Sequence, residues 1–139
     1  MKVNKMNLYE EGLNRFFGPL EARIMQKIWD SGESSIKEVQ QFLNEMSPIS
    51  FNAIMTVMNR LWEKGHLKKQ VHGRSSYFEA IQTKEQFLVE QTKAVTRGLM
   101  EEFGNIIVNQ MIESLDRVEP ESLKKLEAKL NEMKRRSLP

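Results

Sequence analysis

The segment from Ser47 to Ile81 constrains the fold more than any other part of the sequence. Its apolar residues have helical spacing as far as Lys64, and Gly65 then supplies the residue type that ends helices in the left-handed conformation. Beyond this glycine the period changes from 3.6 to 2, and residues 73–75 separate two alternating runs in the manner of a β-hairpin. A helix followed directly by a hairpin with a basic tip predicts a winged helix-turn-helix.

Two helices are predicted before this segment. Pro19 suits the first position of a helix, and Gly32 ends that helix. Ser35 opens the second helix, with Glu38 completing a capping box, and Ser50 is the expected N-cap of the third. The apolar stripes expected to pack together are Leu20, Ile24, Met25, Ile28 and Trp29 on the first helix, Ile36, Val39, Phe42 and Leu43 on the second, and Ile54, Val57, Met58, Leu61 and Trp62 on the third.

The composition excludes several classes of protein. The 139 residues include no cysteine, which excludes disulfides, thiolate metal sites and cysteine nucleophiles. No apolar run approaches the roughly 18 residues of a membrane span, and residues 1–17 lack the apolar core of a secretory signal. We therefore expect a cytoplasmic protein without membrane insertion.

Nothing in the sequence indicates an enzyme. His66 and His72 are the only histidines, and the motifs of zinc proteases, phosphate loops and serine elbows are missing. Structural or wing histidines are the better interpretation. We expect no cofactor and no bound metal.

Positive charge is concentrated in one short stretch. The net charge is only +2, but Arg60 to Arg74 contains five basic residues against one acid, Glu63. A local basic patch on a nearly neutral chain favours docking of an anionic partner. A solvated helix end is the alternative interpretation of this charge.

The face of the third helix opposite its apolar stripe is the candidate DNA-reading surface. Asparagine can bond adenine, threonine can reach several bases, and small or apolar side chains can contact thymine methyl groups. A basic hairpin tip suits a phosphate or minor-groove contact. The alternatives are an ordinary exposed helix face, a soluble turn and a strand edge guarded by lysines against aggregation. The candidate contacts to double-stranded operator DNA are Asn52, Ala53, Met55, Thr56, Asn59 and Arg60 on the helix, Lys68 and Lys69 on the first strand, and Arg74 at the tip.

A helical arm is predicted from Thr83 onward. Thr83 and Gln86 form a capping box, Gly104 interrupts the helix, and Pro120 starts the last one. The arm has too many apolar residues to leave exposed and too few residues for a stable core of its own. We expect a homodimer, because a two-fold DNA reader needs an isologous interface, whereas an arm folded back on its own head is the alternative. The candidate dimerisation residues are Leu99, Phe103, Ile107, Met111, Leu115, Leu126 and Leu130.

The predicted fold class is mainly α with a small β-hairpin. The predicted parts are an N-terminal extension (1–17), a winged helix-turn-helix head (18–82) and a helical dimerisation arm (83–139). The extension is either an arm or a short extra helix. We expect a head ending at Ile81 to fold alone and to bind a two-half-site operator more weakly. The alternative function is a winged-helix protein-interaction module without a DNA target.

Several segments resemble the penicillinase repressor family. The resemblance lies in GPLEARIMQKIWDSGE, SIKEVQQFL, FNAIMTVMNRLWEKGHLKK and GRSSYFEAI, and extends to the tail LDRVEPESLKKLEAKL. It implies a dimeric cytoplasmic repressor on a dyad operator, with head domains on DNA and interlocked helical tails. The family's recognition positions correspond to Asn52, Ala53, Met55 and Thr56, with Arg60 and Arg74 near the DNA backbone.

We expect release through proteolysis of the arm or through another signal that weakens dimerisation. The same resemblance implies two modes of release. In antibiotic-resistance members a membrane sensor detects a β-lactam, and a protease pathway then cuts the repressor ahead of a tail phenylalanine. The corresponding bond joins Glu102 to Phe103, where Glu102 replaces the family's asparagine. A second branch of the family senses copper through tail cysteines, and the absence of cysteine here excludes that mode.

Overall fold

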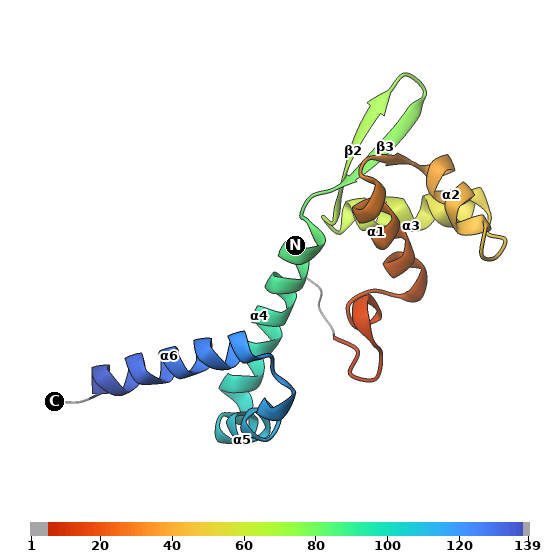
Figure 1. Cartoon of the computed structure of the whole chain (residues 1–139). Helices are drawn as coiled ribbons and strands as arrows, with labels where there is room; N and C mark the ends of the chain where they lie inside the picture. The colour runs from red at the N-terminus through yellow and green to blue at the C-terminus, as the bar shows by residue number, and fades with distance from the viewer. Residues whose placement is uncertain (1–5, 138–139) are drawn as a thin grey trace. The chain divides into compact units, whose positions relative to one another are not determined.

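The chain folds into two compact units, of which the first ends at Val95 and the second begins at Thr96. The computed structural model describes residues 6–137 (Figure 1). The predicted class, a winged helix with C-terminal helices, is confirmed. In chain order the elements are η1 (Gly12–Arg15), α1 (Pro19–Ser31), β1 (Ser34–Ser35), α2 (Ile36–Asn44), α3 (Phe51–Glu63), β2 (Leu67–His72), β3 (Ser75–Ala80), α4 (Lys84–Phe103), α5 (Asn105–Glu113), η2 (Leu115–Arg117) and α6 (Pro120–Ser137).

The helices of the head begin where the sequence predicts. At α2 the Glu38 amide donates to the Ser35 hydroxyl, and the Glu38 carboxylate accepts from the Ser35 amide, both at 3.1 Å. At α3 the Ser50 hydroxyl accepts from the Ala53 amide at 3.1 Å. Each side-chain cap satisfies a backbone N–H that the first helical turn leaves unpaired. Gly65 follows α3 with φ +86°, which confirms its predicted left-handed conformation.

The three helices of the head enclose one apolar core. Two residues predicted to be buried are not: Phe42 is 47% exposed and Trp62 is 43% exposed. Both lie at the edge of their helix's apolar stripe, and each ring faces a lysine ammonium group instead of the core, Lys27 at 5.0 Å and Lys69 at 4.8 Å. The buried core residues are Phe17, Ala22, Ile24, Met25, Ile28, Val39, Leu43, Ile54, Val57, Met58, Leu61, Leu67, Phe78 and Phe87.

The hairpin belongs to a three-stranded antiparallel sheet with the order β1-β3-β2. The sequence predicts the two long strands but not β1, in which Ser34 pairs with Phe78 and Ser35 with Tyr77. A two-residue strand is too short to show an alternating pattern. β1 thereby pairs with the edge of β3 that faces away from β2, directly before the start of α2.

The N-terminal segment contributes to this core. Phe17 stacks on Phe87 at 5.0 Å between ring centroids, Phe16 meets the same ring edge-on at 5.9 Å, and Trp29 lies 5.6 Å from it. Phe87 lies in α4 and is fully buried. A head ending at Ile81 would lack this ring, so the shortest folded head that we now predict ends at Val95.

The second unit consists of the end of α4, then α5, η2 and α6. Gly104, with φ +42°, separates α4 from α5, which confirms the predicted interruption. No side chain between residues 96 and 137 is buried. Within the described residues, no helix combines the length and the apolarity needed to cross a membrane.

Candidate nucleic-acid interface

Helix α3 separates an apolar face from a polar one. Its buried stripe consists of Ile54, Val57, Met58 and Leu61. On the other side Asn52, Thr56 and Arg60 are exposed. The remaining candidates, Ala53, Met55 and Asn59, flank this row and are half-buried. The predicted reading face is therefore accessible along the length of the helix.

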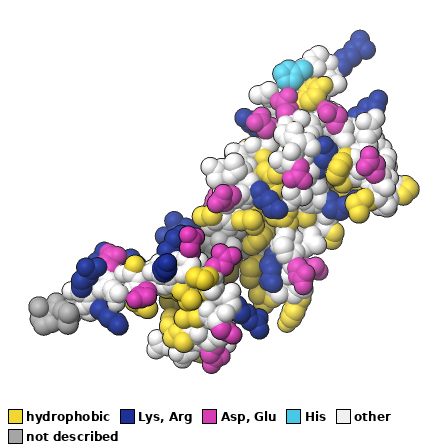
Figure 2. Space-filling model, in the orientation of Figure 1, with side chains coloured by type: hydrophobic (Ala, Val, Ile, Leu, Met, Phe, Trp, Pro, Cys, Tyr) yellow, Lys and Arg dark blue, Asp and Glu magenta, His cyan; other side chains and the backbone are white. Residues whose placement is uncertain are grey.

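The wing extends from α3 as a regular hairpin. His72 pairs with Ser75, so only Gly73 and Arg74 form the turn. Gly73 has φ +65°, whereas no non-glycine residue in the described chain has a positive φ. A positive φ at the first central position alone is the pattern of a type II′ turn, which needs glycine there. The turn thereby places the exposed Arg74 side chain at the tip, where Figure 2 shows a basic side chain beside a histidine.

The basic residues of the patch differ in their surroundings. The Lys64 ammonium lies 3.2 Å from the Glu21 carboxylate, and Lys68 lies 3.6 Å from Glu79, its directly paired residue on β3. The Lys68–Glu79 pair is exposed on both sides, so solvent weakens it, whereas the Glu21 carboxylate is largely covered. Within the described part of the chain, no salt bridge involves Arg60 or Arg74.

Lys69 has a different environment from its neighbour. Its ammonium group donates a hydrogen bond to Asn59 Oδ1 at 3.3 Å. The same nitrogen lies 4.8 Å from the centre of the Trp62 ring and 5.5 Å from that of Phe78. Both aromatic faces attract a cation. Lys69 therefore connects β2 to the exposed side of α3.

The sequence did not predict a groove beside the wing. It has a volume of about 530 Å³ and lies between the start of α2, the start of α3 and the hairpin. Lys37, Phe51 and Tyr77 contribute to its wall together with Arg74. These residues come from three separate elements, and no local motif marks them.

His66 belongs to the aromatic cluster and not to the interface. It is 3% exposed and lies 5.0 Å from Phe17 and 5.9 Å from Phe87 between ring centroids. Its Nδ1 has no hydrogen-bond partner among the described residues. Burial lowers the pKa of His66 below 6.5, and the positive charge of Lys64 acts in the same direction, while Glu21 opposes it. The prediction of a structural histidine fits this environment.

The lowered pKa of His66 predicts a pH dependence of stability. As pH falls below 6.5, the unfolded chain binds a proton that the folded head does not, so the free energy of unfolding falls. One such group contributes at most about 1.4 kcal/mol per pH unit. We expect the melting temperature to fall from pH 7.5 to 5.5, and His66→Leu to remove part of that fall. An unchanged fall in melting temperature in His66→Leu would contradict this assignment.

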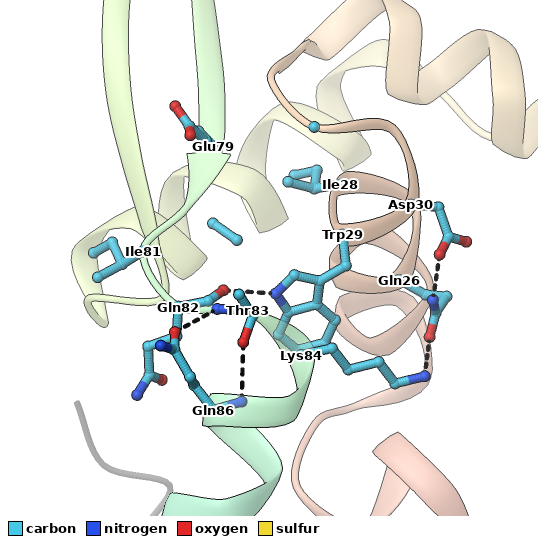
Figure 3. A pocket seen from close by; sticks show the side chains of 12 residues that line it. Gln26, Ile28, Trp29, Asp30, Glu79, Ile81, Gln82, Thr83, Lys84 and Gln86 are labelled. Atoms are coloured by element: carbon cyan, nitrogen blue, oxygen red, sulfur yellow. Dashed lines mark hydrogen bonds between the residues drawn. The ribbon is translucent and has the colours of Figure 1, made fainter.

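The junction between the wing and α4 is fixed by hydrogen bonds to α1 (Figure 3). The Trp29 indole N–H donates to the Gln82 carbonyl at 2.9 Å, and the Lys84 ammonium donates to Gln26 Oε1 at 2.6 Å. These four residues contribute to the wall of a pocket of about 390 Å³. The Thr83–Gln86 capping box, with bonds of 2.9 and 3.0 Å, then starts α4 as predicted. These contacts hold the first turns of α4 on the head.

The helices of the second unit carry a large amount of exposed apolar surface, part of which is visible in Figure 2. Among the predicted dimerisation residues, Leu99, Ile107 and Leu115 are half-buried. The others are between 41% and 53% exposed: Phe103, Met111, Leu126 and Leu130. Glu102 is also exposed, so both residues of the predicted cleavage bond lie on the surface at the end of α4.

No metal centre is evident in the described residues. Between residues 6 and 137, no three histidine, aspartate or glutamate side chains come close enough together to hold an ion.

Three solved structures illustrate the likeness to other regulators. Transcriptional regulator PA4135 is 18% identical, with 78% of this chain and 84% of that chain covered and a TM-score of 0.47. A transcriptional regulator from Thermotoga maritima is 17% identical, with coverage of 86% and 84% and a TM-score of 0.46. A MarR family protein from Bacillus stearothermophilus is 15% identical, with coverage of 85% and 78% and a TM-score of 0.46.

The decisive comparison is with protein families. No curated protein matches the chain. The family model described as penicillinase repressor matches residues 17–132, which include the head, the wing and most of the C-terminal helices. The chain therefore belongs to the penicillinase repressor family and is a winged-helix, DNA-binding transcriptional repressor, not an enzyme.

Proposed function

We propose that this protein is a cytoplasmic repressor that occludes a promoter by binding a dyad operator as a homodimer. The observation that carries the proposal is the polar face of α3 beside a wing with an exposed arginine at its tip. An α-helix fits the major groove of B-DNA, and a hairpin beside it can reach the neighbouring phosphates.

Each candidate contact has a role that fits its chemistry. Asn52 and Thr56 offer hydrogen-bonding groups to base edges, whereas Ala53 and Met55 offer apolar contacts to thymine methyl groups. This set favours A·T base pairs over G·C. The phosphate contacts proposed are those of Arg60, Lys68 and Arg74, with Lys37 added because it borders the groove beside the wing.

The proposed dimer interface is the apolar surface of the second unit. Side chains at intervals along α5 and α6 are between 37% and 64% exposed, which is more apolar surface than a monomer usually leaves in water. Association of two copies would cover it. Joining two heads in this way raises operator affinity through effective concentration, because a single head makes few contacts.

Release is proposed to act on the arm. Cleavage between Glu102 and Phe103 would separate the head from α5 and α6 without changing a DNA contact. The exposure of both residues and the break at Gly104 would allow a protease to reach this bond. We propose a cell-wall antibiotic as the signal, detected by a membrane sensor, on the basis of the family resemblance.

Selection from a random duplex library tests the proposal. The full-length protein should enrich one sequence, and its affinity for that duplex should fall steeply with added salt. For each tenfold rise in salt concentration, the logarithm of the binding constant should fall by about 0.9 per phosphate contact. Absence of enrichment, or an affinity that salt does not alter, would contradict a DNA-binding function and favour a protein-interaction module.

A further inference from the structure

We propose that Lys69 is a positioning residue, which orients Asn59 on the DNA-reading helix and does not itself contact phosphate. The proposal rests on the proposed function, because it assigns roles within the DNA interface. Its starting point is the environment of the Lys69 ammonium group, which lies over two aromatic rings and bonds to Asn59.

The strand pattern places Lys69 on the inner side of the hairpin. Side chains alternate along β2, so Lys69 shares a side with Leu67, which is buried, while Lys68 lies on the opposite side. The residue paired with Lys69 on β3 is Phe78, which is fully buried. The stem of Lys69 therefore starts from the core side of the sheet and extends toward α3.

Three groups hold the ammonium of Lys69. Trp62 and Phe78 present their rings at 4.8 and 5.5 Å, and Asn59 Oδ1 accepts its hydrogen bond at 3.3 Å. A phosphate contact would require the ammonium to leave these partners. Lys68, by comparison, has one exposed carboxylate partner at 3.6 Å. The two adjacent lysines are therefore suited to different tasks.

The contact fixes the direction of the Asn59 amide. A lysine ammonium group only donates hydrogen bonds, so the Asn59 atom facing it must be the carbonyl oxygen. The Asn59 NH2 group is then directed away from Lys69, with two N–H donors available to DNA. Bidentate bonding to adenine uses the asparagine oxygen as well as its nitrogen, and Lys69 already occupies one lone pair of that oxygen. Asn59 is therefore predicted to donate to acceptors, either phosphate oxygens or base edges.

A double-mutant cycle with Asn59 tests this assignment in the full-length protein. The probe is the duplex that the wild-type protein enriches from a random library. Lys69→Met should lower affinity by about threefold to tenfold per head, the range expected for losing one well-oriented hydrogen bond. In an Asn59→Ala background the same substitution should change affinity by less than about twofold, because the group it orients is gone.

Salt dependence separates positioning from direct phosphate contact. Lys69→Met should leave the salt slope unchanged, whereas loss of a phosphate contact in both heads of a dimer would reduce the slope by about 1.8. Lys68→Met is the matched control, since it removes the same charge one residue away, on the other side of the strand. Its effect should add to that of Asn59→Ala. A reduced slope for Lys69→Met, or an effect that also adds fully to Asn59→Ala, would overturn the proposal.

The free protein provides a readout that needs no DNA. The side-chain amide resonances of Asn59 should shift in Lys69→Met and stay in place in Lys68→Met; unchanged resonances in both would overturn the proposal. Lys69→Gln, which makes the same charge change with a polar side chain, serves as the second variant if Lys69→Met melts below the assay temperature. Failure to enrich any duplex would instead refute the proposed function, so the two failures are distinguishable.

Discussion

A chain ending at Glu102 should bind its two-half-site operator at least about 100-fold more weakly than the full-length protein, because linked binding sites gain this much from effective concentration. This truncation reproduces the product of the proposed cleavage. It keeps the head as far as Val95 and removes α5 and α6, with most of the exposed apolar residues of the second unit. Fluorescence anisotropy with full-length and truncated protein would measure the difference.

The matched control for this truncation is a duplex carrying a single half-site. Full-length and truncated proteins should bind that duplex with similar affinity, because their base and phosphate contacts are the same. Analytical ultracentrifugation should report a dimer for the first and a monomer for the second. Equal affinity of the two proteins for the two-half-site operator would refute both the dimer and the proposed mode of release.

Phe87→Ala should destabilise the protein by about 3–5 kcal/mol, the range for removing a buried phenylalanine from a packed core. The Phe87 ring is fully buried and lies 6 Å or less from the rings of four residues: Phe16, Phe17, Trp29 and His66. Replacing the Phe87 ring with a methyl group would leave a cavity where the N-terminal segment, α1 and α4 meet. Urea unfolding of the full-length protein, followed by circular dichroism, would measure the loss.

Phe103→Ala is the control for that experiment. Phe103 lies on the same helix but is 49% exposed and belongs to the second unit. Its substitution should leave the unfolding of the head nearly unchanged and weaken self-association instead. If Phe87→Ala cost no more stability than Phe103→Ala, the aromatic cluster would not be the element that holds α4 on the head.

Most of the fold could be predicted from local sequence signals. The capping pairs Ser35–Glu38 and Thr83–Gln86 and the positive-φ glycines Gly65 and Gly104 act within a few residues, so the sequence alone identifies them. Periodicity likewise identifies the apolar faces of α1 and α3. The hairpin follows from alternation around a glycine-containing turn.

Features that depend on distant parts of the chain were missed or mistaken. Strand β1 exists because Ser34 and Ser35 meet β3, more than 40 residues away, and nothing local indicates it. Periodicity shows which side of a helix is apolar but not how wide the covered stripe is, so Phe42 and Trp62 were wrongly predicted to be buried. The role of Phe17 in the core depends on Phe87, far along the chain.

In the candidate DNA interface, too, local spacing predicted some features and missed others. The polar face of α3 follows from helical spacing, and its exposure agrees with that prediction at Asn52, Thr56 and Arg60. Lys68 and Lys69 were both predicted to contact DNA because both are basic. A count of charges ignores which side of a strand a residue occupies. Alternation from Leu67 would already have placed Lys69 on the inner side of the hairpin.

The symmetry of the DNA sequences that the full-length protein enriches from a random library decides whether it reads DNA as a two-fold dimer. A homodimer with one reading helix per copy requires two inverted half-sites, with centres separated by about one helical turn of 10–10.5 base pairs or a multiple of it. We expect such a dyad, rich in A·T pairs and bound by two copies of the chain. Enrichment of a single, asymmetric half-site bound by one copy would contradict it.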